Sequence, residues 1–281
     1  MGQVAVCRVT LPQPGVEFVR PPEDNFIDGL VWDKLQRLGI APSGLADDAM
    51  FLRRVYLDTL GALPTPAEAR AFLASENPEK RSRLIAELLE RDEYADYWAM
   101  RWSDILRVDR DVVTPQGAVA MTRWLRRQIK ANTPYDEFVR EIITARGNTY
   151  AEGPASLFQA LSSPELLGRS VSQVFLGVRI ECAQCHQHPM EKWGQRDYFA
   201  FAGFFTGVKR KGISSGGQMV VATGGEDLKH PRTKEPVPAA ALGAPPPDLS
   251  QYQDRREALA EWMISKENRF LSRSIVNRIW A

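Results

Sequence analysis

A Ser, Thr or Asn residue followed directly by proline recurs five times in this chain of 281 residues, and this dipeptide constrains the fold most strongly. Such polar side chains cap the first turn of a helix, and proline, which has no amide hydrogen, suits the first helical position. The five dipeptides are Thr65-Pro66, Asn77-Pro78, Thr114-Pro115, Thr133-Pro134 and Ser163-Pro164. Each predicts the start of a helix, and Glu68 completes a capping box with Thr65.

Apolar residues repeat at helical spacing after these starts, as they do at Leu84, Ile85, Leu88 and Leu89. The pattern predicts helices at 25–38, 47–61, 66–74, 78–90, 93–109, 115–131, 135–146, 164–182, 195–206, 254–265 and 270–281. We therefore predict an all-α fold, a multi-helix bundle.

Glycine and proline interrupt the helical pattern between residues 207 and 253, which predicts a long loop region with a short strand at Gln218–Ala222. Near the start, alternating β-branched residues within Gly2–Leu11 predict a short β segment. We expect four parts. They are the end of an upstream β domain with its linker (1–22), a helical domain (23–208), a Gly/Pro-rich loop region (209–253) and the truncated start of a downstream helical domain (254–281).

The charge balance limits the classes of partner. The chain has 36 basic and 35 acidic residues, so no field of one sign attracts nucleic acid or an anionic membrane. No apolar run approaches the roughly 20 residues of a membrane-spanning helix, and the first residues lack the pattern of a secretory signal. We expect neither a nucleic-acid partner nor a membrane-spanning segment.

The helical domain carries the run Cys182-Ala183-Gln184-Cys185-His186, a C-x-x-C-H motif. This motif is the attachment signature of a c-type haem. One helical turn separates the two cysteines, so both sulfurs lie on one side of the backbone and can form thioethers with the two vinyl groups of one porphyrin. The imidazole of His186 then binds the iron axially. The sequence thus predicts haem c as the cofactor.

Residues just past the motif extend the predicted cofactor site. We expect His188 to hydrogen-bond a ligand or a propionate on the same side of the ring rather than to bind the iron. Met190 and Trp193 supply apolar surface for one side of a porphyrin, although positions in an ordinary core fit the periodicity equally well. The distal iron ligand is unknown; the candidates within the chain are His230, Met219 and Met121, beside an open or water-bound position.

Other chemistry is compatible with the same side chains. Cys182, Cys185, His186 and His188 are suitable zinc ligands, although zinc-binding histidines usually lie on a separate element. A redox-active thiol pair or a structural disulfide would also use two cysteines at this spacing. A hydrolase has no support, since the sequence contains neither a G-x-S-x-G nor an H-E-x-x-H motif.

Several segments together resemble the family called domain of unknown function 1549, over about residues 24–208. They are residues 51–61, 63–65, 94–98 and 134–140, with the motif and its continuation at 182–189. The resemblance implies a cytochrome-associated domain of planctomycete-type bacteria. Residues 268–281 resemble the opening of domain of unknown function 1553, and Gly2–Leu11 resembles the last strand of a bacterial immunoglobulin-like domain.

The resemblance also implies a setting for the chain. Proteins of this architecture are large, exported and similar to electron-transfer components, and haem is attached to C-x-x-C-H motifs outside the cytoplasm. We therefore expect a periplasmic or other extracytoplasmic location. The expected partners are flanking domains of the same polypeptide and a redox protein, with the domain acting as the redox module of a larger protein or enzyme.

Overall fold

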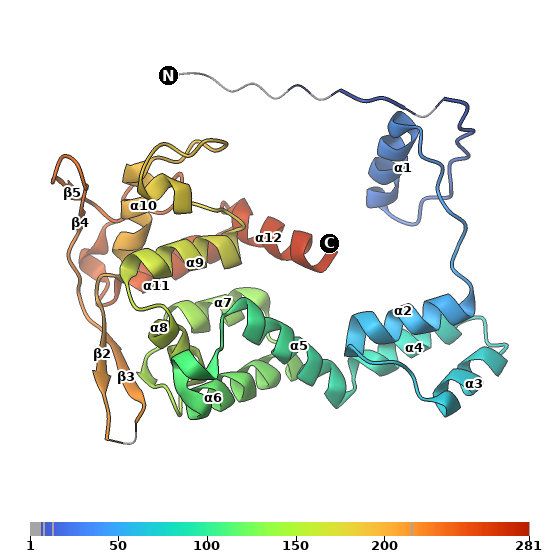
Figure 1. Ribbon diagram of the computed structural model, residues 1–281, viewed down its shortest axis with the longest axis horizontal. Coiled ribbons are helices and arrows are strands. Elements are labelled where there is room, and N and C mark those ends of the chain that lie inside the picture. Colours follow the sequence, from blue (N-terminus) through green and yellow to red (C-terminus); the bar gives the residue numbers. More distant parts are fainter. Residues whose placement is uncertain (1–6, 8, 13, 215, 281) are drawn as a thin grey trace. The chain divides into compact units, whose positions relative to one another are not determined.

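The computed structural model describes residues 7, 9–12, 14–214 and 216–280 (Figure 1). By its internal contacts the chain forms two compact units, Met1–Asp58 with Ala62–Lys80, and Thr59–Gly61 with Arg81–Ala281. Helices make up most of the described residues, as the sequence predicts, and a few short strands accompany them. No helix in the described part of the chain is both long and apolar enough to cross a membrane.

Local capping sets the helices of the first unit, α1 (Phe26–Leu38), α2 (Asp48–Leu60) and α3 (Pro66–Ala74). The predicted capping box is present at α3, where the Thr65 amide donates to Oε2 of Glu68 at 2.7 Å and the Glu68 amide donates to the Thr65 hydroxyl. Phe51 of α2 stacks on Phe72 of α3, with ring centroids 6.0 Å apart. Pairing of these rings joins the two helices.

The second unit contains most of the helices and the C-x-x-C-H motif. After α4 (Lys80–Leu89), which begins at the end of the first unit, come α5 (Asp92–Ile105), α6 (Arg110–Lys130), α7 (Tyr135–Ile143), η1 (Gly153–Ala155), α8 (Ser156–Ala160), α9 (Pro164–Leu176), η2 (Glu181–Gln184), α10 (Gln195–Ala202), η3 (Gly203–Phe205), η4 (Leu249–Gln251), α11 (Arg255–Ile264) and α12 (Arg269–Trp280).

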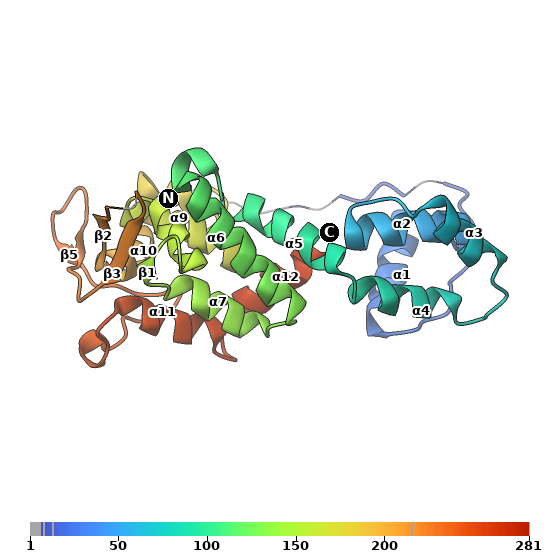
Figure 2. The same ribbon diagram turned by 90° about the horizontal axis from the view of Figure 1, so that it is seen from below.

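An aromatic cluster forms the centre of this unit. Trp102 of α5 lies 5.0 Å from Phe138 of α7 and 6.5 Å from Phe175 of α9, measured between ring centroids, and Trp124 of α6 stacks on Phe138 at 5.2 Å. The four rings come from helices that the apolar periodicity predicts. Helix α11 lies beside α7 (Figure 2), and α12 packs against α9. Two of the three predicted boundaries, those at 208 and 253, fall inside this second unit.

Short strands occur where the sequence predicts mainly loops. β1 (Gly147–Asn148), β3 (Gln218–Ala222) and β2 (Val208–Gly212) form an antiparallel sheet in that order, and β4 (Leu228–Lys229) pairs with β5 (Pro236–Val237). β3 occupies the residues at which the sequence predicts a short strand. Of the predicted N-terminal β segment, residues 2–6 and 8 lie outside the described residues, and residues 7 and 9–12 have no regular secondary structure.

Two helices differ from the prediction in ways that matter for the site. The helix predicted at 164–182 is wrong at its end, because α9 stops at Leu176 and Gly177 adopts a left-handed conformation with φ of 69°. The helix predicted at 115–131 begins earlier, at Arg110, and is kinked at Thr114. The Thr114 hydroxyl accepts the Gly117 amide at 3.3 Å, so the predicted start is present inside a longer helix.

The tight approach of η1 to α6 leads to a prediction. A Cβ at Gly153 would lie 2.6 Å from the backbone oxygen of Ala120, and backbone atoms cannot move aside as a flexible side chain can. We expect Gly153→Ala to lower the free energy of unfolding by about 1–3 kcal/mol, measured by urea denaturation. Gly212→Ala is the control, since nothing lies within 4 Å of its Cβ position. Equal midpoints for the two variants would contradict this packing.

Candidate functional site

The first three residues of the C-x-x-C-H motif lie in a short 3₁₀ helix, η2, and Cys185 and His186 follow directly after its end. The helix predicted at 164–182, which would have reached Cys182, ends at Leu176. The Cys185 and His186 amides both donate to the carbonyl of Cys182, each at 3.4 Å. In a 3₁₀ turn the side chains at positions i and i+3 eclipse one another. Cys182 and Cys185 stand in this i, i+3 relation, which is the spacing that attachment of two thiols to one porphyrin requires.

The turn is anchored from its opposite side. Ile180 and Ala183 are fully buried and belong to the hydrophobic core of the second unit. The side-chain amide of Gln195, at the start of α10, donates to the carbonyls of Gln184 at 3.0 Å and Cys185 at 2.9 Å. Apolar contacts and two hydrogen bonds thus fix the backbone, while both cysteines are exposed free thiols.

The hydrogen bond of the His186 ring determines which of its two nitrogens carries the hydrogen. Its side chain is exposed, and Nδ1 lies 2.7 Å from the carbonyl oxygen of Gln187. A carbonyl oxygen only accepts hydrogen bonds, so Nδ1 carries the proton and Nε2 of the neutral ring carries the lone pair. Histidines that bind metals usually donate their second ring nitrogen to such an acceptor. His186 is therefore oriented as a ligand that binds through Nε2.

The other two histidines of the chain show the reverse pattern. Nδ1 of His188 accepts the Met190 amide at 3.2 Å. Nδ1 of His230 accepts the amides of Arg232 and Thr233, both at 3.3 Å. Since Nδ1 is the acceptor in both rings, the proton of the neutral form is on Nε2. Of the three histidines, His186 alone presents the lone pair of Nε2.

A hydrogen-bonded loop follows the motif. The Gln187 side-chain amide donates to the carbonyls of Lys192 and Trp193, both at 3.0 Å, and the His188 amide donates to Trp193 at 2.8 Å. The Trp193 ring faces the interior, where its centroid lies 6.3 Å from that of Phe270 on α12. Met190 is 77% exposed. The two residues predicted to line a porphyrin thus occupy different environments, one in the core and one at the surface.

Charged and polar groups beneath the turn join it to α9. Arg169 of α9 forms an ion pair with Glu181, the residue before Cys182. The hydroxyl of Tyr198 on α10 donates to the carbonyl of Glu165 at 3.3 Å. Burial raises the pKa of Tyr198 to about 12, so this hydroxyl stays neutral and keeps donating at physiological pH. These contacts join the first half of α9 to α10 and to the residue before the motif.

A comparison with protein families identifies the family of this chain. The model of the family described as "PSCyt2: Protein of unknown function (DUF1549)" matches residues 26–210, more than half of the chain and all of the motif. The chain belongs to this family. No curated protein matches it, and no solved structure matches it. The predicted DUF1549 membership is confirmed, whereas the resemblances of the two ends to other domains stay predictions.

The metal-binding side chains of this DUF1549 chain indicate which cofactor it can hold. Among the described residues, no three His, Cys, Asp or Glu side chains gather in an arrangement that could hold a metal ion. A structural zinc site needs four such ligands in a tetrahedron. A porphyrin brings its own four nitrogens, so the protein has to supply only two thiols and an axial imidazole. The exposed Cys182, Cys185 and Nε2 of His186 fit that requirement.

The candidates for a distal ligand lie in three separate places. Met121 is buried in the hydrophobic core of the second unit. Met219 is part of β3, and His230 follows β4 with Nδ1 already hydrogen-bonded. None of the three belongs to the turn or to the loop after it, so the distal ligand stays unassigned.

Proposed function

We propose that this chain is a c-type haem-binding, electron-transfer domain of a larger exported bacterial protein. One observation carries the proposal. Two exposed thiols lie three residues apart at one turn, where the Cys185 amide donates to the Cys182 carbonyl, and the next residue is the histidine that presents the lone pair of Nε2. A structural role alone would require neither the exposure of both thiols nor this tautomer.

The chain's own residues would hold and orient the cofactor. Cys182 and Cys185 would form the thioethers, and His186 would supply the axial nitrogen. The Gln187 carbonyl fixes the ring of His186, and Gln195 fixes the turn that carries all three side chains. When bound, the haem supplies reversible one-electron oxidation and reduction of its iron. The protein contributes position, hydrogen bonding and solvent exposure, which together tune the potential.

Exposure of the motif supports transfer between proteins. Both thiols and the His186 ring lie at the surface, so a cofactor attached there would be accessible to a redox partner or to a flanking domain of the same polypeptide. Because haem is attached to C-x-x-C-H motifs outside the cytoplasm, the proposed domain would lie in the periplasm or another extracytoplasmic compartment. In that setting it would act as the redox module of a larger protein.

Covalent attachment is the direct test. We expect the chain, exported in a host with haem-attachment machinery, to show a haem c pyridine haemochrome spectrum and an intact mass increased by one haem. Cys182→Ala and Cys185→Ala should each leave a single thioether or no haem, and the double variant should carry none. Cys7→Ala is the matched control, because Cys7 is exposed and lies outside the motif. It should retain the full haem content.

Two outcomes would contradict the proposal. A colourless protein of unmodified mass from a competent host would remove the cytochrome assignment. Stoichiometric zinc in that protein, lost in Cys182→Ala but kept in Cys7→Ala, would establish the zinc-binding alternative instead. Covalent haem in the double cysteine variant would show that the attachment residues are assigned wrongly.

A further inference from the structure

A cavity of about 620 Å³ is lined in part by Lys192, a residue of the loop that follows the motif. Its walls come from this loop, from residues 242–245, and from the corner between α11 and α12. The residues that matter for its chemistry are Lys192, Leu242, Trp262, Arg269, Phe270 and Arg273. The volume falls within the range of small-molecule sites, roughly 300–1,000 Å³. None of Cys182, Cys185 and His186 lines it, so the cavity is separate from the thiols.

The inner wall of the cavity is apolar and aromatic. The ring of Phe270 lies between those of Trp193 and Trp262, with centroids 6.3 Å and 6.4 Å away. Leu242 is buried beside them, and Ala244 and Pro245 continue the wall. Flat apolar groups pack well against such rings. The wall therefore favours a ligand with a ring-sized apolar body.

Three cations surround this apolar wall, against a single acid, Glu267. Lys192, Arg269 and Arg273 form no ion pair within the part of the chain that the structure describes. Nζ of Lys192 lies 4.8 Å from the ring centroid of Trp193, which holds the ammonium at the rim. The uncompensated positive charge favours an anionic group on the ligand.

The two arginines are placed where they weaken their own helix. Arg269 and Arg273 are four residues apart on α12, so their like charges repel across one helical turn. Arg269 is also the first residue of α12, where the helix dipole disfavours a cation, and this first turn contains no acid. An anion bound in the cavity would reduce both the repulsion between the two arginines and the unfavourable interaction of Arg269 with the helix dipole.

We propose that this cavity is a binding site for a small aromatic carboxylate. The ring system would lie against Phe270 and Trp262, and the carboxylate would face Arg269, Arg273 and Lys192. The site does not depend on haem, because its lining shares no side chain with the attachment motif.

Titration with 1-naphthoate and with its neutral analogue 1-naphthylmethanol tests the site. We expect saturable binding of 1-naphthoate to the full chain without haem, measured by isothermal titration calorimetry, and about tenfold weaker binding of the alcohol, because charge-assisted hydrogen bonds are lost. Arg269→Gln and Arg273→Gln should each weaken naphthoate binding several-fold and leave the alcohol unchanged. Arg232→Gln is the matched control, since Arg232 is exposed on the β4–β5 hairpin and does not line the cavity.

A second variant tests the shape of the cavity. Ala244→Phe would place a ring inside it and should abolish binding of both compounds, with an unchanged urea midpoint showing that the chain is folded. Equal affinity for the acid and the alcohol, or unchanged naphthoate binding in the Arg269→Gln, Arg273→Gln double variant, would overturn the proposal. Because both arginines are exposed, those two variants decide the question even if Ala244→Phe does not fold.

Discussion

Arg256→Ala is expected to lower the free energy of unfolding of the second unit by about 3–5 kcal/mol. The guanidinium is fully buried, with Nε 3.0 Å from Oδ1 of Asp254, Nη2 2.7 Å from Oδ2 of Asp254, and Nη1 2.9 Å from the carbonyl oxygen of Ala145. It also lies 4.6 Å from the ring centroid of Phe158. Alanine would leave the buried Asp254 carboxylate without its bidentate partner.

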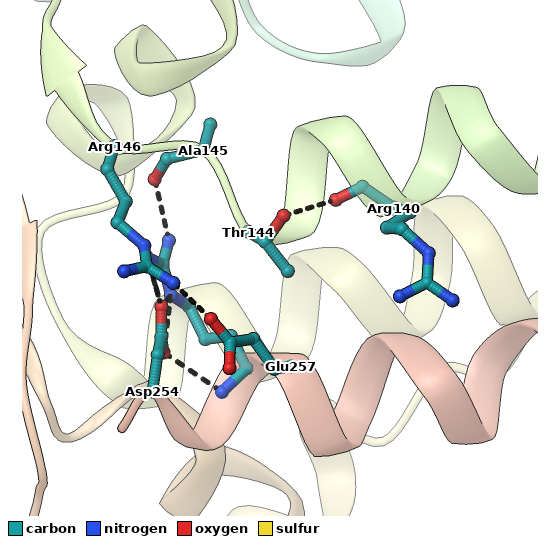
Figure 3. A network of polar contacts seen from close by, with 7 residues as sticks. Arg140, Thr144, Ala145, Arg146, Asp254 and Glu257 are labelled. Atoms are coloured by element: carbon teal, nitrogen blue, oxygen red, sulfur yellow. Dashed lines mark hydrogen bonds and ion pairs between the residues drawn. The ribbon is translucent and has the colours of Figure 1, made fainter. Parts of the chain in front are cut away.

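The surroundings of Asp254 explain why the loss would not be compensated. Figure 3 shows Arg146 reaching both Asp254 and Glu257, and the Arg146–Asp254 distance is 3.4 Å. Arg146 is 43% exposed in its side chain, so its interaction is screened by water. It cannot replace a buried, hydrogen-bonded guanidinium. Since whole domains have stabilities of about 5–15 kcal/mol, this one substitution would leave the unit marginally folded.

Urea denaturation followed by circular dichroism measures the effect. Arg232→Ala, at an exposed hairpin position, serves as the matched control and should stay within about 0.5 kcal/mol of the parent. The loss of unfolding free energy in Arg146→Ala should lie between the losses in Arg232→Ala and Arg256→Ala. A loss below about 1 kcal/mol for Arg256→Ala would mean that water or Arg146 satisfies Asp254, and that the network does not hold α11 to the end of α7.

His186→Ala, in the haem-attached chain proposed above, is expected to remove the axial imidazole while both thioethers remain. The physical reason is that His186 presents Nε2 as an acceptor, whereas the Nδ1 atoms of His188 and His230 already accept backbone amides. Magnetic circular dichroism and electron paramagnetic resonance report the axial ligand, and the intact mass reports the haem. Added imidazole should restore the parent spectrum of the variant.

His188→Ala is the matched control, two residues further along the same loop. It should keep the imidazole-ligand spectrum, since Nδ1 of its ring already accepts the Met190 amide. Loss of the spectrum in His188→Ala but not in His186→Ala would reverse the two roles. Loss of haem from His186→Ala in the intact mass would instead assign the residue to attachment.

Helix-capping residues made most of the helices predictable from the sequence. Thr65 and Glu68 form their box within four residues, and Ser163 caps α9 by accepting the Leu166 amide at 3.2 Å. These are contacts between close neighbours in the chain, so the residue types alone predict them. The end of α9 was not predictable in this way. Apolar residues continue at helical spacing past Gly177, and a glycine alone does not end a helix.

The candidate site likewise has features that the sequence predicts and features that depend on tertiary packing. The haem chemistry stays a prediction from the spacing of Cys182, Cys185 and His186, since two thiols and an imidazole within five residues suit few cofactors. Membership of the DUF1549 family assigns no activity to the chain. The 3₁₀ turn, the exposure of the thiols and the tautomer of His186 depend on Ile180 and Ala183 packing into the core and on Gln195 reaching across from α10.

Long-range contacts decided the rest. Asp254 accepts the Arg256 amide as an ordinary N-cap, and that much is local. The burial of this pair under the carbonyl of Ala145, 111 residues away, comes from the packing of α11 beside α7. The cavity likewise joins Lys192 to residues 242–245 and to α12. The sequence by itself determined most of the helix starts and the spacing of the two thiols and the histidine, because short-range hydrogen bonds and residue order encode them. Only the tertiary structure decided which side chains are buried, paired or left open to a ligand, because that depends on segments far apart in the chain.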